Sequence, residues 1–236
     1  MLELKNISKT YKKSEVKACD NVSITIEDGD IYGFIGPNGA GKSTTIKCIV
    51  GIHNYDTGEI LLDGVSIKDN PKEAKMKMAY VPDNPDLYEH LSGIEYINFV
   101  CNVYNANEGK DDLVHKYAKM FNIEEALASP IKSYSHGMKQ KVALIAALAH
   151  KPKLLILDEP FVGLDPKASH DLKIVMKELC DNGTMIFFSS HVLEVVEKLC
   201  NKIAIIKNGK IVASGNVDEI IGNSSLEDIF LELYHE

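Results

Sequence analysis

The sequence lacks any apolar stretch long enough to cross a membrane. Its longest uninterrupted apolar run, Val142 to Ala149, has eight residues, whereas a membrane-spanning helix needs about 20. The first residues, MLELKNISKTYKK, alternate polar and apolar side chains and contain no apolar core of the kind that signal peptides have. We therefore expect no secretion, and we expect any membrane-spanning part to belong to another polypeptide.

Clustered positive charge is also missing. The 236 residues carry a net charge of −8, whereas a protein that binds a nucleic-acid backbone normally presents a clustered basic face. This balance argues against nucleic acid as a partner.

The cysteines form no pattern of paired positions. No two of them have the C-x-x-C spacing of a zinc site or a redox pair. Scattered thiols of this kind are typical of a cytosolic protein, so we predict that they are reduced and buried. The five cysteines are Cys19, Cys48, Cys101, Cys180 and Cys200.

The composition is that of an ordinary globular protein, with 45% hydrophobic and 25% charged residues. Alternation in LELKNIS and VSITIED predicts antiparallel strands, and the continuous apolar run IYGFI predicts a buried strand that ends in glycines. From about Leu87 to Ala149 the pattern indicates helices only, one of them opened by a capping box from Ser92 to Glu95. Strand–helix alternation then resumes with LLILDEP, which predicts an α/β core interrupted by a helical insertion.

We therefore predict a single α/β domain over residues 1–236, of the P-loop ATPase type, with a mixed sheet, an antiparallel β flank and an inserted helical subdomain. The core and the β flank take residues 1–86 and 150–215, and the insertion takes residues 87–149. Residues 216–236 form a tail in which apolar residues recur at helical spacing.

A glycine-rich loop follows the predicted buried strand. It fits the pattern G-x-x-x-x-G-K-[ST], in which glycines let successive backbone N–H groups turn inward around phosphates while the next helix presents its positive N-terminal end. Lys42 would reach the β- and γ-phosphates of ATP, and Ser43 would be a ligand of Mg²⁺. The alternative is a glycine-rich turn that arises by chance. The residues of this predicted phosphate site are Gly36, Pro37, Asn38, Gly39, Ala40, Gly41, Lys42, Ser43 and Thr44.

Two adjacent carboxylates follow the apolar residues of LLILDEP. Asp158 would emerge at the carboxyl end of the strand, where open parallel sheets bind ligands, and would lie beside Mg²⁺. Glu159 would point elsewhere, where it could polarise a water for in-line attack on the γ-phosphorus. Without the glycine-rich loop, the Asp-Glu-Pro sequence would be interpreted as a loop cap.

Three further motifs accompany these two: YSHGMKQK lies between them, and GLDP and then SSH, which ends in His191, follow them. In this order and spacing the motifs resemble those of the ATP-binding cassette (ABC) family. The resemblance covers nearly the whole chain, from Tyr11 to His191. The family's Leu-Ser-Gly-Gly-Gln signature aligns with YSHGM, which keeps the serine and one glycine as Ser135 and Gly137.

The resemblance implies a site completed by a second cassette, because in the family two cassettes pack head to tail. The signature helix of one subunit then closes on the nucleotide of the other, through Ser135 and Gly137, and Asp165 acts across the interface. Ser135 stands where a helix N-cap would, and a helix N-terminus stabilises a phosphate by hydrogen bonds and its dipole. His191 would clamp the γ-phosphate and Tyr11 would stack on adenine. A capping histidine and an ordinary strand aromatic are the alternatives.

One position departs from the family pattern. The strand after the first hairpin usually ends in a glutamine whose amide touches Mg²⁺ or the lytic water, whereas YVPDNPDLY puts Asp83 there. Either Asp83 contacts the metal through water, or Asn84 substitutes for it. The alternative is that Asp83 is a turn residue between two prolines.

We therefore expect an ATPase that converts ATP and water to ADP and phosphate. The resemblance implies a homodimer or heterodimer, peripheral on the inner face of the cell membrane, that powers transport through a separate permease. The YVPDNPDLY segment and the tail resemble those of exporters with separately encoded permeases, which favours export. One alternative is a soluble ABC ATPase of the assembly type. Another is a regulatory cassette that binds ATP without turnover, which would more naturally lack Glu159 or His191.

Overall fold

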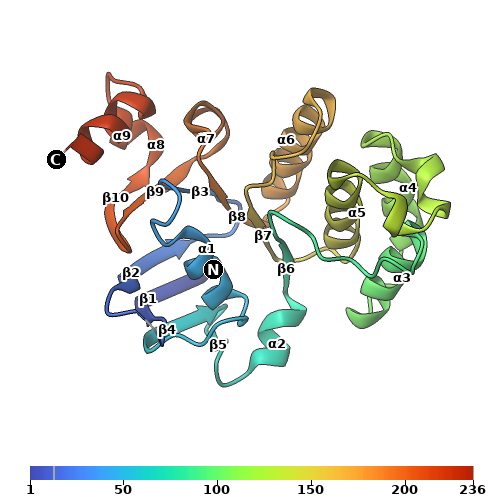
Figure 1. Ribbon diagram of the computed structural model, residues 1–236, viewed down its shortest axis with the longest axis horizontal. Helices are drawn as coiled ribbons and strands as arrows, with labels where there is room; N and C mark the ends of the chain where they lie inside the picture. The colour runs from blue at the N-terminus through green and yellow to red at the C-terminus, as the bar shows by residue number, and fades with distance from the viewer. Residues whose placement is uncertain (13, 236) are drawn as a thin grey trace.

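Residues 1–12 and 14–235 are described by the structure, a computed structural model in which the strands form two sheets (Figure 1). The larger sheet has six strands in the order β10-β9-β3-β8-β7-β6. All neighbouring strands in it are parallel except β9 and β10, which form an antiparallel hairpin. This mixed sheet with its covering helices confirms the predicted fold class. The strands are β3 (Ile31–Ile35), β6 (Met78–Val81), β7 (Leu154–Asp158), β8 (Met185–Ser190), β9 (Lys202–Lys207) and β10 (Lys210–Asn216).

The smaller sheet is the antiparallel flank that the alternating N-terminal segments predict. Its four strands run in the order β2-β1-β4-β5. The turn between β4 and β5 is Asp63-Gly64, and both residues have positive φ, as tight hairpin turns require. The strands are β1 (Leu2–Thr10), β2 (Lys17–Ile26), β4 (Thr57–Leu62) and β5 (Val65–Ser66).

Two groups of helices lie at opposite ends of the larger sheet. Figure 1 shows α3, α4 and α5 together beyond β6, whereas α8 and α9 lie at the end formed by β9 and β10. Helices α6 and α7 contact the central strand β3, and α1 contacts β2 and β7. The helices are α1 (Lys42–Ile49), α2 (Pro71–Met76), α3 (Gly93–Val103), α4 (Lys110–Met120), α5 (His136–Ala149), α6 (Pro166–Asp181), α7 (Leu193–Leu199), α8 (Val217–Ile221) and α9 (Leu226–His235), with 3₁₀ turns over Glu124–Ala128 and Ile131–Ser133.

The capping predictions in the helical region are confirmed. The Ser92 hydroxyl accepts a hydrogen bond from the Glu95 N–H, and the Glu95 carboxylate accepts one from the Ser92 N–H. Ser135 caps α5 by accepting from the N–H of Met138. The region is not purely helical, because Ser92 and Pro130 form an isolated antiparallel bridge. Pro130 cannot donate a helical hydrogen bond, and the chain runs extended there.

The apolar run of the sequence is a core helix. Residues 142–149 form the end of α5 and all of them are buried. Among the residues that the structure describes, no helix is both long enough and apolar enough to cross a membrane.

The central strands β3, β7 and β8 are covered on both faces, which explains why all their residues are buried. Successive residues of β3 alternate between two clusters: Tyr32 and Phe34 pack toward the antiparallel flank, and Ile31 and Ile35 pack toward the helices. All five cysteines are buried and free, as predicted.

The capping box generates a stability prediction. We expect Ser92→Ala to lower the free energy of unfolding by about 1 kcal/mol, because the N-terminus of α3 loses a side-chain acceptor. Chemical denaturation measures this change. Ser129→Ala, at an exposed position with no side-chain role in a helix cap, serves as the control and should change stability by less than about 0.5 kcal/mol. Equal stability of the two variants would show that the box contributes nothing.

Candidate nucleotide-binding site

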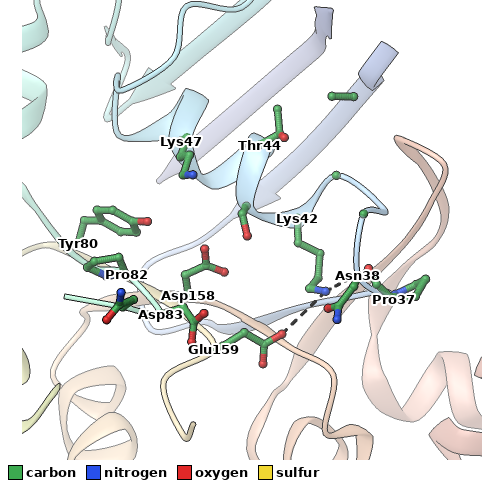
Figure 2. A pocket seen from close by; sticks show the side chains of 15 residues that line it. Pro37, Asn38, Lys42, Thr44, Lys47, Tyr80, Pro82, Asp83, Asp158 and Glu159 are labelled. Carbon is green, nitrogen blue, oxygen red and sulfur yellow. Dashed lines mark hydrogen bonds and ion pairs between the residues drawn. The ribbon is translucent and has the colours of Figure 1, made fainter. Parts of the chain in front are cut away.

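A cavity of about 440 Å³ opens where β3, β6 and β7 end (Figure 2). Parallel strands bring their carboxyl ends to one edge, and this is where open α/β sheets bind ligands. Ten of the residues predicted for the site line it: Pro37, Asn38, Gly39, Gly41, Lys42, Ser43, Thr44, Asp83, Asp158 and Glu159. The cavity therefore joins the predicted phosphate loop to Asp83, Asp158 and Glu159.

The phosphate loop has no space for side chains behind it. A Cβ added at Gly41 would lie 2.4 Å from the carbonyl oxygen of Ala18, and φ at Gly41 is +115°, which side chains disfavour. A Cβ at Gly36 would lie 2.5 Å from the carbonyl oxygen of Ile206. The loop is thus fixed by neighbouring backbone. It continues directly into the first turn of α1, so its N–H groups and those of the helix N-terminus can bind an anion together.

Lys42 lies over this loop with only 6% of its surface exposed. Its ammonium donates to the carbonyl oxygens of Gly36 at 2.6 Å and Pro37 at 3.3 Å, and lies 3.8 Å from Oε1 of Glu159. Burial lowers the pKa of Lys42, and the charges of Glu159 and Asp158 counteract part of that effect. The ammonium is therefore held in place by groups that a bound phosphate would compete with.

The two adjacent carboxylates have different surroundings. Asp158 is buried and accepts a hydrogen bond from the Ser189 hydroxyl on the neighbouring strand β8. Glu159 has φ of +50°, a rare conformation for a residue with a side chain, and its N–H donates to Ser189. Figure 2 shows the Glu159 side chain directed toward Lys42, whereas Asp158 lies below the first turn of α1. The two carboxylates therefore meet different groups, and their division into a metal ligand and a base stays a prediction.

His191 extends the charged array from outside the cavity. Its Nδ1 lies 2.9 Å from Oε2 of Glu159, and its side chain is about half exposed. The Glu159 carboxylate thus bridges Lys42 and His191. The structure brings together the three residues that the sequence predicts as catalytic.

The oxygen donors at this edge of the sheet fit a magnesium ion that takes some ligands from the protein and the others from phosphates. Ser43, Asp83 and Asp158 all line the cavity, and oxygen donors are what Mg²⁺ prefers. In the described part of the chain, no group of three or more His, Cys, Asp or Glu residues could hold a metal alone. Magnesium ions usually keep only one or two protein carboxylates and take the rest from water and phosphate, so this donor set is suitable.

Tyr80 lines the cavity near Asp158 and Asp83. Burial raises the pKa of its phenol, and the nearby charges of Asp158 and Asp83 raise it further. Tyr80, Lys47, Pro82 and Ala18 line the cavity although the sequence did not single them out. Lys47 could have been found, because it follows Ser43 by four residues on α1 and so shares its face. Ala18 enters the wall only through the tertiary packing of β2.

Tyr11 lies beside the cavity and does not line it. Its side chain is exposed, its hydroxyl is 3.2 Å from Oγ1 of Thr44, and its ring meets His53 edge-on at 5.6 Å. Thr44 lines the cavity, so the Tyr11 side chain contacts the cavity wall from outside. This location is compatible with the predicted stacking on adenine, which stays a prediction.

The signature residues lie apart from the cavity. Ser135 and Gly137 begin α5, and Asp165 caps α6 by accepting from the N–H of Ala168. Lys141 donates to Asp165 at 2.8 Å, which lowers the pKa of that carboxyl. A Cβ at Gly137 would lie 2.5 Å from the carbonyl oxygen of Gly163. The signature helix and the GLDP loop therefore form one packed unit, and contact with a second nucleotide stays a prediction.

Sequence comparisons agree with this geometry. A protein-family profile described as ABC transporter matches residues 19–162. The ABC-type transporter ATP-binding protein EcsA of Bacillus subtilis is 35% identical, and the match covers 100% of this chain and 97% of EcsA. The lipopolysaccharide export system ATP-binding protein LptB of Escherichia coli is 32% identical, with 98% of this chain and 96% of LptB covered.

Solved structures give the same result. The structure of an ATP-binding subunit of an ABC transporter superposes with a TM-score of 0.94 at 34% identity, covering 99% of both chains. A dimeric ATP-binding cassette in a post-hydrolysis state, bound to ADP and phosphate, gives a TM-score of 0.83 at 25% identity over 92% of this chain and 99% of the other. The protein belongs to the family of ABC transporter ATP-binding subunits.

Proposed function

We propose that this chain hydrolyses ATP to ADP and phosphate and thereby drives transport through a separate membrane-spanning permease. The observation that carries the proposal is the array Lys42–Glu159–His191 at the mouth of a phosphate loop, with contacts of 3.8 Å and 2.9 Å on the central carboxylate. A cation for phosphate, a base for water and an imidazole beside them are the groups that phosphoryl transfer needs.

In the proposed reaction, the loop amides and Lys42 bind the β- and γ-phosphates. A water attacks the γ-phosphorus, the bond from this phosphorus to the β–γ bridging oxygen breaks, and a proton of the water passes to Glu159. His191 orients the Glu159 carboxylate and contacts the γ-phosphate. Ser43 and Asp158, with Asp83 through water, would hold Mg²⁺, which when bound neutralises charge on the phosphate oxygens.

We further propose that two cassettes act together. Ser135 and Gly137 lie outside the cavity of their own chain, so a role at a γ-phosphate requires a second subunit. The dimeric cassette among the structural relatives supports this arrangement. The second subunit is either a copy of this chain or a different cassette. Size-exclusion chromatography of the purified chain with ATP distinguishes the two, because only a homodimer forms without another polypeptide.

An apolar surface on the helical region supports a membrane partner. Tyr88 is 59% exposed and Phe99 is 44% exposed, and their rings stack edge-to-face at 5.4 Å. Beside them a groove of about 210 Å³ runs between β6, α3 and α5, lined by Tyr96, Val100 and Tyr104 among others. Exposed apolar patches of this kind mark interaction sites. We propose that a cytoplasmic helix of the permease occupies this groove, which puts the chain on the inner face of the membrane.

We propose export as the direction. The relative LptB belongs by name to an export system, and the segment around Asp83 and the tail resemble those of exporters with separate permeases. The alternative, a soluble assembly-type ATPase, needs no membrane partner, so partner capture separates the two.

Glu159→Gln tests the base. Because the amide keeps the size of the side chain and one acceptor oxygen but cannot take a proton, we expect Mg-ATP binding to persist while phosphate release falls by about 10² or more. Size-exclusion chromatography with ATP should then show a stable dimer. Glu194→Gln, at an exposed glutamate paired with Lys198, is the control. Normal phosphate release from Glu159→Gln would contradict the mechanism, and ATP-independent monomers would contradict the dimer.

Asp83 variants test the metal contact. If the carboxylate acts on Mg²⁺, Asp83→Asn should lower hydrolysis several-fold and weaken its dependence on Mg²⁺, and Asp83→Glu should keep part of the activity, because charge matters more than reach. Asp83→Gln, which restores the family's usual residue, should recover basal hydrolysis. The measurement is a magnesium-titrated ATPase assay without a partner. Asp86→Asn, likewise preceded by proline, is the control. Wild-type behaviour of Asp83→Asn would make Asp83 a turn residue.

The double variant Tyr88→Ser with Phe99→Ser tests the partner surface. We expect basal hydrolysis near the wild-type rate and loss of the co-purifying membrane protein from detergent-solubilised membranes, because the apolar contact is removed. Val16→Ser changes an apolar residue that is 72% exposed and directly precedes β2, away from this surface, and should retain the partner. If neither the wild type nor the control captures a protein with spans of about 20 apolar residues, the soluble alternative is favoured.

A further inference from the structure

The C-terminal helix α9 is tied to the end of β9. The Tyr234 hydroxyl donates to the carbonyl oxygen of Ile206, and the Lys207 ammonium donates to the carbonyl oxygen of Leu233 at 2.8 Å. The Lys207 ammonium also lies 5.5 Å from the centre of the Tyr234 ring, and Phe230 stacks on that ring at 4.5 Å. Two hydrogen bonds in opposite directions therefore join the helix to two consecutive residues, Ile206 and Lys207, at the end of the strand.

Ile206, whose carbonyl oxygen accepts the hydrogen bond from Tyr234, also packs against the phosphate loop. Ile206 is fully buried. Its carbonyl oxygen and Cγ2 would lie 2.5 Å and 2.9 Å from a Cβ at Gly36, and its Cδ1 would lie 3.1 Å from a Cβ at Gly41. Ile206 thus fills the space behind both glycines that flank the loop, and a shift of β9 at this point changes the shape of the loop.

The hairpin turn adds a direct hydrogen bond to the same loop. The N–H of Gly209 donates to the carbonyl oxygen of Ala40 at 2.8 Å, and the carbonyl oxygen of Gly209 accepts from the N–H of Asp20 at 2.8 Å. The turn is therefore fixed between the phosphate loop and β2. From α9 to Ala40 the contacts form a continuous chain through Lys207 and Gly209.

A phosphate site built from backbone depends on the directions of its N–H groups. A loop that is already held in the binding conformation loses less conformational entropy when phosphate binds, so its affinity for phosphate is higher. We propose that Tyr234 is a positioning residue of the nucleotide site, which acts through Ile206 to hold the phosphate loop in its phosphate-binding shape. This inference rests on the proposed function as an ATPase. Burial raises the pKa of Tyr234 to about 12, so the phenol remains a hydrogen-bond donor throughout the physiological range.

Tyr234→Phe tests the inference, because it removes the hydroxyl and keeps the ring that Phe230 and Lys207 contact. We expect KM for ATP to rise about 3- to 10-fold, as for loss of one buried hydrogen bond, with kcat close to wild type. Hydrogen exchange should become faster in peptides covering 36–41 and 204–211, and stay unchanged in α3. Tyr117→Phe, at a buried tyrosine of α4, is the control and should leave all of these values unchanged.

Lys207→Met is the second variant, since it removes the other hydrogen bond from the strand side and should shift KM and exchange in the same direction. Unchanged KM and exchange in both variants would overturn the proposal. A fall in kcat and melting temperature, together with faster hydrogen exchange throughout the chain, would also overturn it, because Tyr234 would then only stabilise the fold. If the wild type does not hydrolyse ATP, the proposed function fails, and the exchange of the 36–41 peptide still decides whether α9 controls the loop.

Discussion

The phosphate loop must present backbone N–H groups, and this requirement governs the structure around it. A chain segment that turns its amides toward a ligand has to pack its other side closely, and at Gly36 and Gly41 the neighbouring backbone lies too near for any side chain. Three elements meet there: β2 through Ala18, β9 through Ile206 and the hairpin turn through Gly209. The antiparallel flank and the C-terminal strands are thus part of the site's construction as well as of the core.

Charge at the site is arranged by strand pairing. Parallel pairing of β7 with β8 brings Ser189 beside Asp158, so the buried carboxylate has a donor, and the same serine holds the backbone of Glu159 in its left-handed conformation. That conformation turns the second carboxylate toward Lys42 and His191. A phosphate that enters would compete with Gly36, Pro37 and Glu159 for one buried ammonium, so binding also frees the Glu159 carboxylate.

The parts of the site that follow from local spacing could be predicted from the sequence. The loop from Gly36, the carboxylates that end β7 and the Ser92 capping box each depend on residues a few positions apart. The supports could not be predicted, because Ala18, Ser189 and Ile206 are ordinary residues. Ser189 and Ile206 reach the site through strand pairing in the larger sheet, and Ala18 reaches it through the packing of β2 against the phosphate loop. The tail shows the same limit, since its spacing indicates a helix but does not show which carbonyl the Tyr234 hydroxyl meets.

The segment between β6 and α3 connects the nucleotide cavity with the apolar patch that we propose as the partner surface. It starts at the edge strand of the sheet, lines the nucleotide cavity with Asp83 and reaches the exposed apolar patch at Tyr88. Coupling between distant sites needs an element that both sites bias. Asp83 and Tyr88 are close along the chain, so under the proposed function this segment is the shortest covalent connection between the nucleotide cavity and the partner surface. The phosphate loop contacts β2, β9 and the hairpin turn instead, so we infer that coupling passes through the segment from Asp83 to Tyr88.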